Sequence, residues 1–235
     1  MVVTMLEHFQ LNNCIEILKN ERPVFFSEAD FQMSLARLIT ESNPSIKVML
    51  EYPYYVDPEN IENSLIQYFD IILIDEVSFV VIELKYRQKK LKEVYTDSYT
   101  GLPLYLKEHS AQDQGCFQFW NDIHRIENAR FRETISGKKF EKGYSLMLTN
   151  DPSYWNKPTK NKTSYDAFQL YDGRELVKNT ELAFRKGTAK SSNGDKKFII
   201  RGDYSISWED YSSLFPSEAS KKNGIFRYLL LEIKP

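Results

Sequence analysis

The chain has 235 residues, of which 42% are hydrophobic, and this is enough to bury one substantial core. Its 31 basic and 33 acidic residues give a net charge of −2, which argues against nucleic-acid binding through a strongly basic overall surface. No apolar run approaches the length of a membrane span and no secretory leader is apparent, so we expect a cytoplasmic protein with no membrane partner.

The first core element is predicted to be a helix that begins near Glu28. Ser27 has the residue type of an N-cap, and Asp30 stands three residues later, where Glu is more usual. Apolar residues then recur at helical spacing and should face the core. They are Phe31, Leu35, Leu38 and Ile39.

A strand is predicted over residues 48–56. Pro53 interrupts it, and because proline cannot donate to a ladder, this strand should lie at an edge or contain a bulge. Glu51, in the same segment, is a candidate acidic ligand, although an acidic residue on a strand often just faces solvent.

The next two segments, 68–74 and 79–85, are rich in Ile, Val, Phe and Tyr and are predicted to form a hairpin. A carboxylate, Asp70, interrupts the first apolar run, and Glu83 and Lys85 end the second. An ionised carboxylate in a buried strand is unfavourable unless a cation or hydrogen bonds compensate it. These three residues are therefore the first candidates for a functional site.

The short loop between the two segments predicts their register. A two-residue turn at 76 and 77 pairs residue 74 with 79, and the same register places Asp70 opposite Glu83, with Cβ atoms roughly 5 Å apart. Lys85 lies two residues beyond Glu83 and should point to the same face. We therefore expect both carboxylates and the lysine to share one surface of the hairpin.

Two carboxylates at that separation repel each other unless a proton or a cation lies between them. A hard divalent ion such as Mg²⁺ suits an all-carboxylate site, and a nearby lysine can orient a water or stabilise developing charge. The alternative is a structural salt-bridge network at a strand end. The apolar residues on both sides of Asp70 favour a functional site.

A polar and basic segment that includes Arg87 follows, and then a helix is predicted over about residues 110–131. Next comes a core strand over 143–149. The helix carries a polar stripe apart from its apolar face, and this stripe is either a site-facing surface or an ordinary solvated face. It comprises Gln114, Gln118, Asn121 and Arg125.

The C-terminal part is less regular. Residues 151–203 read as a polar, loop-rich insertion, and short strands over 196–200 and 204–208 are predicted to form a hairpin across 201–203. A strong strand over 225–233 is expected to extend the core sheet. The prediction is therefore one domain over 1–235, with a core at about 25–150 and C-terminal strands over 204–235.

The hairpin residues resemble the signature of the PD-(D/E)xK nuclease superfamily, whose core is the restriction-endonuclease-like fold. Asp70 matches the aspartate of the first strand, and Glu83 and Lys85 match the Glu-x-Lys of the next. Phe69 stands where the family's loosely kept proline would be. The resemblance covers about residues 25–150, and the order helix, three strands, helix, strand agrees with the superfamily core.

This resemblance implies an α/β fold with a mixed central sheet flanked by helices and a C-terminal β-rich elaboration. It also implies a nuclease that uses Mg²⁺ or Mn²⁺ to hydrolyse nucleic acid, with DNA the favoured partner. Asp70 and Glu83 would hold the metal, and Lys85 would act on the attacking water or the developing charge. Glu28 is the favoured further acidic residue, for metal binding or for positioning Lys85, and Glu51 is the alternative.

For substrate binding, the resemblance points to a glutamine on the helix after the lysine strand, which is Gln114 or Gln118 here. Arg87 is a further candidate for phosphate contact. Cleavage of both strands of a duplex would favour a homodimer. The alternative function is a catalytically inactive module of the same fold that binds nucleic acid or a protein partner.

Overall fold

A six-stranded mixed sheet forms the centre of the protein, with the strand order β1-β2-β3-β6-β12-β11. The computed structural model describes residues 5–55, 65–98, 100–129, 137–159, 163–185 and 196–235. β3 and β6 run parallel, and the other neighbouring pairs in this sheet are antiparallel. The strands are β1 (Lys47–Tyr55), β2 (Ile66–Ile74), β3 (Ser78–Arg87), β6 (Lys139–Thr149), β11 (Trp208–Ser213) and β12 (Ile225–Ile233).

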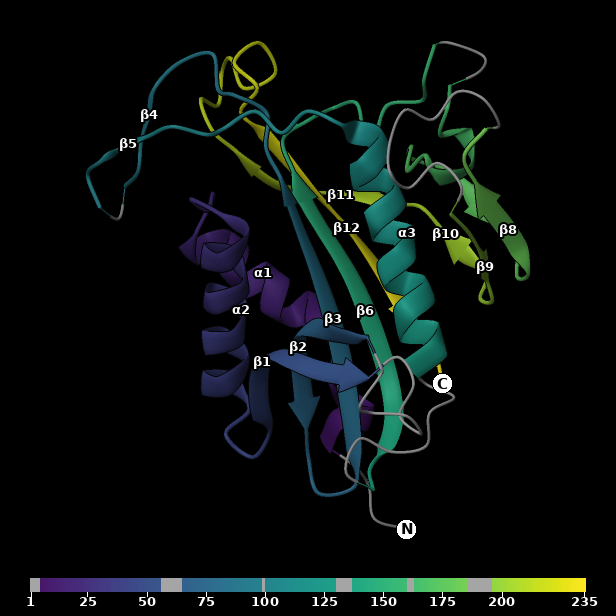
Figure 1. Cartoon of the computed structure of the whole chain (residues 1–235). Coiled ribbons are helices and arrows are strands. Elements are labelled where there is room, and N and C mark those ends of the chain that lie inside the picture. The colour runs from purple at the N-terminus through teal and green to yellow at the C-terminus, as the bar shows by residue number, and fades with distance from the viewer. Residues whose placement is uncertain (1–4, 56–64, 99, 130–136, 160–162, 186–195) are drawn as a thin grey trace.

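Helices cover both faces of this sheet (Figure 1). α1 (Leu11–Glu21) and α2 (Glu28–Ser42) lie on one face, and α3 (Gln112–Ala129) lies on the other. A short 3-10 helix, η1 (Met5–His8), precedes α1. The order α2, β1, β2, β3, α3, β6 confirms the predicted order of elements, with a small hairpin added between β3 and α3. That hairpin consists of β4 (Tyr95–Thr96) and β5 (Pro103–Leu104).

Two hydrophobic layers hold the helices to the sheet, and the alternation of side chains along β3 decides which residues face which layer. Ile82 and Leu84 belong to the layer beneath α1 and α2, whereas Val81 belongs to the layer beneath α3. Glu83 and Lys85 lie two and four residues after Val81, so their side chains point to the same face of the strand. They therefore fall on the face that α3 covers.

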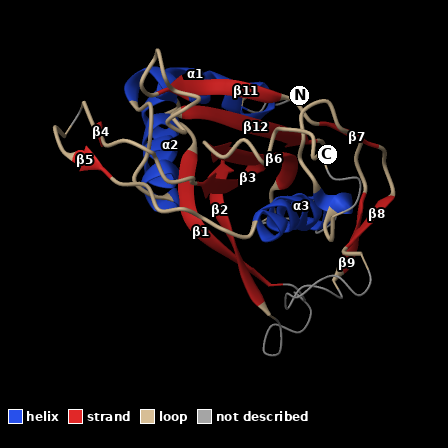
Figure 2. Ribbon diagram, turned by 90° about the horizontal axis from the view of Figure 1, so that it is seen from above, coloured by secondary structure: helices blue, strands red, loops and turns tan. Residues whose placement is uncertain are grey.

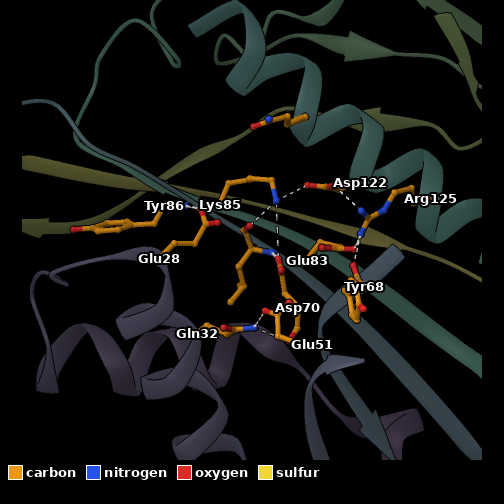
Figure 3. Close-up of polar contacts among 12 residues, drawn as sticks. Glu28, Gln32, Glu51, Tyr68, Asp70, Glu83, Lys85, Tyr86, Asp122 and Arg125 are labelled. Atoms are coloured by element: carbon orange, nitrogen blue, oxygen red, sulfur yellow. Dashed lines mark hydrogen bonds and ion pairs between the residues drawn. The ribbon is translucent and has the colours of Figure 1, made fainter. Parts of the chain in front are cut away.

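The start of α2 follows the sequence prediction. The Ser27 side chain accepts a hydrogen bond from the Asp30 backbone N–H at 3.1 Å, which satisfies one of the unpaired donors of the first turn. This cap fixes Glu28 as the first residue of the helix. It thereby holds the Glu28 carboxylate at the end of α2 that approaches β3 (Figure 3).

The edge position predicted for the Pro53 strand is confirmed, because β1 is the outer strand of the sheet on that side. The register between β1 and β2 skips from Leu50 to Tyr52, and Glu51, the residue in between, has a φ of 49°. Left-handed backbone is uncommon outside glycine, and it coincides here with an interruption of the ladder at Glu51 and Asp70, with the same register on both sides. The predicted C-terminal strand is also confirmed, since β12 pairs with β6 inside the main sheet.

The predicted hairpin across residues 201–203 is wrong. Figure 2 shows the small C-terminal strands on the α3 side of the molecule, and the two segments of the predicted hairpin pair with other partners. β9 (Lys197–Ile200) pairs with β8 (Thr180–Ala183), and β10 (Tyr204–Ser205) pairs with β7 (Glu175–Leu176). Buried apolar residues of the 151–203 segment, such as Phe168 and Leu182, pack beneath and beside α3. The polar insertion therefore contributes to the core.

Close packing between α3 and β6 depends on Gly143. A Cβ atom at this position would collide with the Ile126 side chain of α3. We expect Gly143→Ala to lower the free energy of unfolding by about 1–3 kcal/mol, because added volume in a packed core forces neighbouring groups to shift. Urea unfolding followed by circular dichroism measures this loss, and an unchanged midpoint would show that α3 is less tightly seated.

Within the described residues, no helix combines the length and the apolar character that crossing a lipid bilayer requires.

Candidate active site

The side chains of Asp70, Glu83 and Lys85 lie together on the α3 face of the sheet (Figure 3). The ammonium of Lys85 lies 4.0 Å from the nearest Asp70 oxygen and 2.8 Å from Asp122 Oδ2. It also donates to the Leu84 carbonyl at 2.8 Å. The three residues that the sequence singled out are thus neighbours, and α3 supplies a further carboxylate.

The predicted register between β2 and β3 is confirmed as far as their ladder extends, from Ile74 opposite Phe79 to Ile71 opposite Ile82. Beyond this point the strands are not paired through their backbones. Instead, Asp70 Oδ2 accepts the Leu84 backbone N–H at 2.6 Å. The Asp70 carboxylate therefore lies in the opening between the two strands rather than on a continuous sheet.

Glu28 occupies a similar position one step further along β3. Its Oε2 atom accepts the Tyr86 backbone N–H at 2.6 Å. Burial raises the pKa of Glu28 above its ordinary value, while the charge of Lys85 and the Tyr86 hydrogen bond oppose this shift. The structure thus brings Glu28 close enough for electrostatic coupling to the lysine.

Glu51, on β1, is connected to the cluster through Gln32 of α2. The Gln32 amide bridges the two elements, donating to Glu51 Oε1 at 2.8 Å and to the Asp70 carbonyl at 2.7 Å (Figure 3). Glu51 is exposed, and its carboxylate is held on Gln32. Glu28, whose carboxylate binds β3 itself, is therefore the better placed of the two alternatives.

Glu83 is deeply buried, with 2% of its surface exposed, and its partner is Arg125 of α3. The same guanidinium nitrogen that binds Glu83 donates to the Tyr68 carbonyl at 2.9 Å, and the guanidinium lies 5.7 Å from the centre of the Phe69 ring. Burial and the nearby Asp122 charge raise the pKa of Glu83 well above its ordinary value, whereas Arg125 opposes this.

Lys85 is held as a cation. Burial alone would lower its pKa, but the carboxylates of Asp122, Asp70 and Glu83 more than offset burial, and the pKa is raised above the ordinary lysine value. A lysine of this kind is a poor proton acceptor at neutral pH. What it can supply is a positive charge and hydrogen-bond donors aimed into the gap between β2 and β3.

Asp122 and Arg125 were not predicted as site residues. Arg125 belongs to the polar stripe noted in the sequence, and Asp122 stands three residues before it, on the same side of the helix. Asp122 is 4% exposed, although it is charged. The sequence pattern that could have identified them is a carboxylate and a guanidinium three residues apart, next to Ile123 and Ile126, which are buried.

Of the predicted substrate contacts, Gln118 and Arg87 are brought together. The Arg87 guanidinium donates to Gln118 Oε1, and Arg87 follows Lys85 on the same face of β3. Gln114 lies one turn nearer the start of α3 and donates to Asp113 at 3.3 Å. The geometry therefore favours Gln118 over Gln114 as the glutamine beside the cluster.

The fit of this cluster to a metal ion depends on the number of ligands required. In the part of the chain that the structure describes, no three Asp, Glu, His or Cys side chains converge as a preformed metal cage, so Asp70, Glu83 and Glu28 do not form one. Mg²⁺, however, is commonly bound by one or two carboxylates, with waters and substrate phosphates completing its shell. Asp70 and Glu83, together with the Leu84 carbonyl, provide oxygen donors of the right chemistry.

Comparison with protein-family models, with curated proteins and with solved structures finds no match for this chain. The residues and geometry of this cluster are therefore what indicates the function of the protein.

Proposed function

We propose that this protein is a metal-dependent nuclease with a restriction-endonuclease-like core, which hydrolyses phosphodiester bonds in nucleic acid, with DNA as the favoured substrate. The observation that carries the proposal is the meeting of Asp70 with Glu83 and Lys85 where β2 and β3 cease to pair. Two acidic residues and a permanently charged lysine at a strand opening are the groups that such hydrolysis requires.

The fold supports this proposal. The antiparallel β1-β2-β3 unit is followed by α3 and by β6, which pairs with β3 in the parallel sense. This is the order and direction expected of the superfamily core to which the sequence motif belongs. The motif also lies in the strands where that resemblance requires it, which is a stronger constraint than the short sequence pattern by itself.

In the proposed mechanism, Asp70 and Glu83 would hold a Mg²⁺ or Mn²⁺ ion. When bound, this ion supplies Lewis-acid activation of a phosphoryl oxygen and lowers the pKa of a coordinated water. Lys85 donates hydrogen bonds to the attacking water or to the phosphoryl oxygen on which negative charge develops. Asp122 positions the lysine through the 2.8 Å ion pair with its ammonium group.

Arg87 and Gln118 would contact the phosphate next to the scissile bond. Their mutual hydrogen bond orients both side chains on the face that carries Lys85. A guanidinium matches phosphate geometry, and the amide can donate to a phosphate oxygen. These local donors allow phosphate binding in a protein whose net charge is −2.

A polymeric substrate fits this site better than a small phosphate ester. A cavity of about 650 Å³ lies elsewhere, at the ends of β11 and β12, and its lining includes Trp155, Asp210 and Arg227 rather than the Asp70 cluster. The Asp70 cluster therefore lies outside this cavity, whereas small substrates are usually bound within such concave sites. A nucleic-acid strand laid along a surface needs no such enclosure.

The test is incubation of the purified protein with labelled single-stranded and double-stranded DNA and RNA, in Mg²⁺, in Mn²⁺ or in EDTA. We expect cleavage that requires metal and is lost in Asp70→Asn, whose side chain keeps its size but loses its charge. Glu51→Gln is the matched control, because it removes a neighbouring exposed carboxylate bound to Gln32. Equal cleavage by Asp70→Asn and wild type would contradict the assignment.

One observation favours the second candidate function, a catalytically inactive module that binds nucleic acid or a protein. The carboxylate of Glu83 is already paired with a cation, Arg125. In such a module the cluster would be a structural network, and nucleic-acid affinity in EDTA would be the same for wild type and Asp70→Asn. Metal-dependent cleavage by the wild type distinguishes the two functions.

A further inference from the structure

Arg125 is the cation that contacts Glu83, one of the two carboxylates proposed to hold a divalent ion. Its guanidinium is paired with the buried Glu83 carboxylate and is anchored to β2 by the Tyr68 carbonyl and the Phe69 ring. Because Glu83 is 2% exposed, there is little room for a metal ion and the guanidinium together at this carboxylate. The arginine and the ion are thus competitors for one ligand.

A second partner for Arg125 is already in place. Asp122 stands three residues earlier on α3, and its Oδ1 atom lies 4.0 Å from the Arg125 guanidinium. The other oxygen, Oδ2, is buried and, within the described residues, makes no hydrogen bond, although it lies 2.8 Å from the Lys85 ammonium. Asp122 therefore has the capacity to accept a guanidinium that leaves Glu83.

We propose that Arg125 is a built-in counter-ion of Glu83, and that metal binding transfers this arginine from Glu83 to Asp122. The inference rests on the proposed nuclease function and concerns how its metal site is regulated. Arg125 and Asp122 are positioning residues in this scheme, because they act through Glu83 and Lys85 rather than by touching the substrate.

The charges of the cluster explain why such an exchange is favourable. Four carboxylates, from Asp70, Glu83, Asp122 and Glu28, lie near two cations, from Lys85 and Arg125. Of the three that form ion pairs with these cations, Asp70 is the one whose nearest cation is most distant, with Lys85 at 4.0 Å. A divalent ion held by Asp70 and Glu83 would compensate both, and Arg125 would then pair with Asp122 Oδ1 while Lys85 stays on Oδ2.

The first test is the affinity of the full-length protein for Mn²⁺ alone, measured by isothermal titration calorimetry without substrate. Arg125→Met should bind Mn²⁺ about tenfold or more tightly than wild type, because the competing cation is gone. Arg125→Lys should fall between the two. Arg87→Met is the matched control, since it removes a positive charge from the same face without touching the Glu83 pair, and it should change the affinity much less.

The second test asks whether Asp122 acts through Arg125. Asp122→Asn should weaken Mn²⁺ binding about tenfold in the wild-type background and have a much smaller effect in the Arg125→Met background, which is a double-mutant cycle. If Arg125→Met leaves a buried charge that destabilises the fold, Mn²⁺ should raise its unfolding temperature more than that of wild type.

The outcomes separate this inference from the proposed function. Metal-dependent cleavage by the wild type, with Arg125→Met binding Mn²⁺ no more tightly than Arg87→Met, would overturn the counter-ion role and leave the nuclease in place. Absence of Mn²⁺ binding in every variant, with no cleavage, would overturn both. An Asp122→Asn effect of equal size in both backgrounds would overturn the transfer to Asp122.

Discussion

Replacement of Lys85 by methionine is expected to reduce metal-dependent cleavage by about three orders of magnitude, which is the scale observed when a preorganised donor to developing charge is removed. Methionine retains most of the side-chain volume, so the α3 layer should stay packed. The measurement is kcat/KM on the preferred polymer, with circular dichroism to show that the variant is folded. Lys85 is unlike an ordinary surface lysine because four nearby carboxylates, from Asp122, Asp70, Glu83 and Glu28, raise the pKa of its ammonium group.

The matched control is Lys89→Met. Lys89 lies two residues beyond the end of β3 and pairs with Asp151 at 3.5 Å, outside the cluster. Its replacement should change kcat/KM by less than about fivefold, as expected for loss of a partly exposed ion pair. Equal losses in the two variants would indicate that general positive charge, rather than a specific lysine, supports cleavage.

The protonation state of Lys85 gives a related expectation for the pH profile. Because neighbouring carboxylates raise its pKa above the ordinary value, the lysine remains charged up to at least about pH 10. Any fall in kcat/KM between neutral pH and about pH 10 should therefore come from another group. The same fall should be seen in a Lys85→Arg variant that retains activity. The charge that the proposed mechanism assigns to Lys85 is thus constant over the physiological range.

The largest effect on stability is expected from Glu127→Ala. Glu127 is fully buried on α3, and its carboxylate accepts the backbone N–H groups of Arg201 and Gly202 and the Tyr204 hydroxyl, at 2.7–3.0 Å. Alanine would remove the acceptor that these donors share, which includes the partner of the buried Tyr204 hydroxyl, and would also open a cavity at a fully buried position. We expect a loss of roughly 3–5 kcal/mol in the free energy of unfolding, measured by urea denaturation.

Glu181→Ala is the control for this prediction. Glu181 is an exposed glutamate on β8 that pairs with Lys197 at 3.1 Å, and its loss should cost less than about 1 kcal/mol. Glu127→Gln keeps one acceptor oxygen and should fall between the two. If Glu127→Ala were as mild as Glu181→Ala, the C-terminal hairpins would not depend on this carboxylate.

The parts of the fold that were predictable from sequence are those in which local chemistry selects one arrangement. The β2-β3 register is an example, because Asp75 Oδ1 accepts the Val77 and Ser78 backbone N–H groups and closes a two-residue turn. Once that turn is formed, the positions of Asp70 and Glu83 along their strands follow. The N-cap of α2 was predictable for the same reason.

The remaining features depend on partners that are distant in sequence. Alternating apolar residues in β9 and β10 indicate strands but do not specify their partners, and the nearest pairing was therefore the wrong prediction. The Glu127 carboxylate binds residues 201 and 202 to α3, so this segment meets a helix instead of closing a hairpin. Asp122 was missed likewise, because its role appears only once α3 is packed across Lys85.

The close approach of α3 to β6 at Gly143 limits which substitutions this position can accept. Ile126, which abuts Gly143, neighbours Arg125 and lies one turn from Asp122 on the same helix. A larger side chain at position 143 would move the helix, and the distances from its two charged residues to Glu83 and Lys85 would change with it. The packing at Gly143 and the ion pairs of Asp122 and Arg125 are therefore linked, and a change at position 143 would need a compensating change in α3 to keep both.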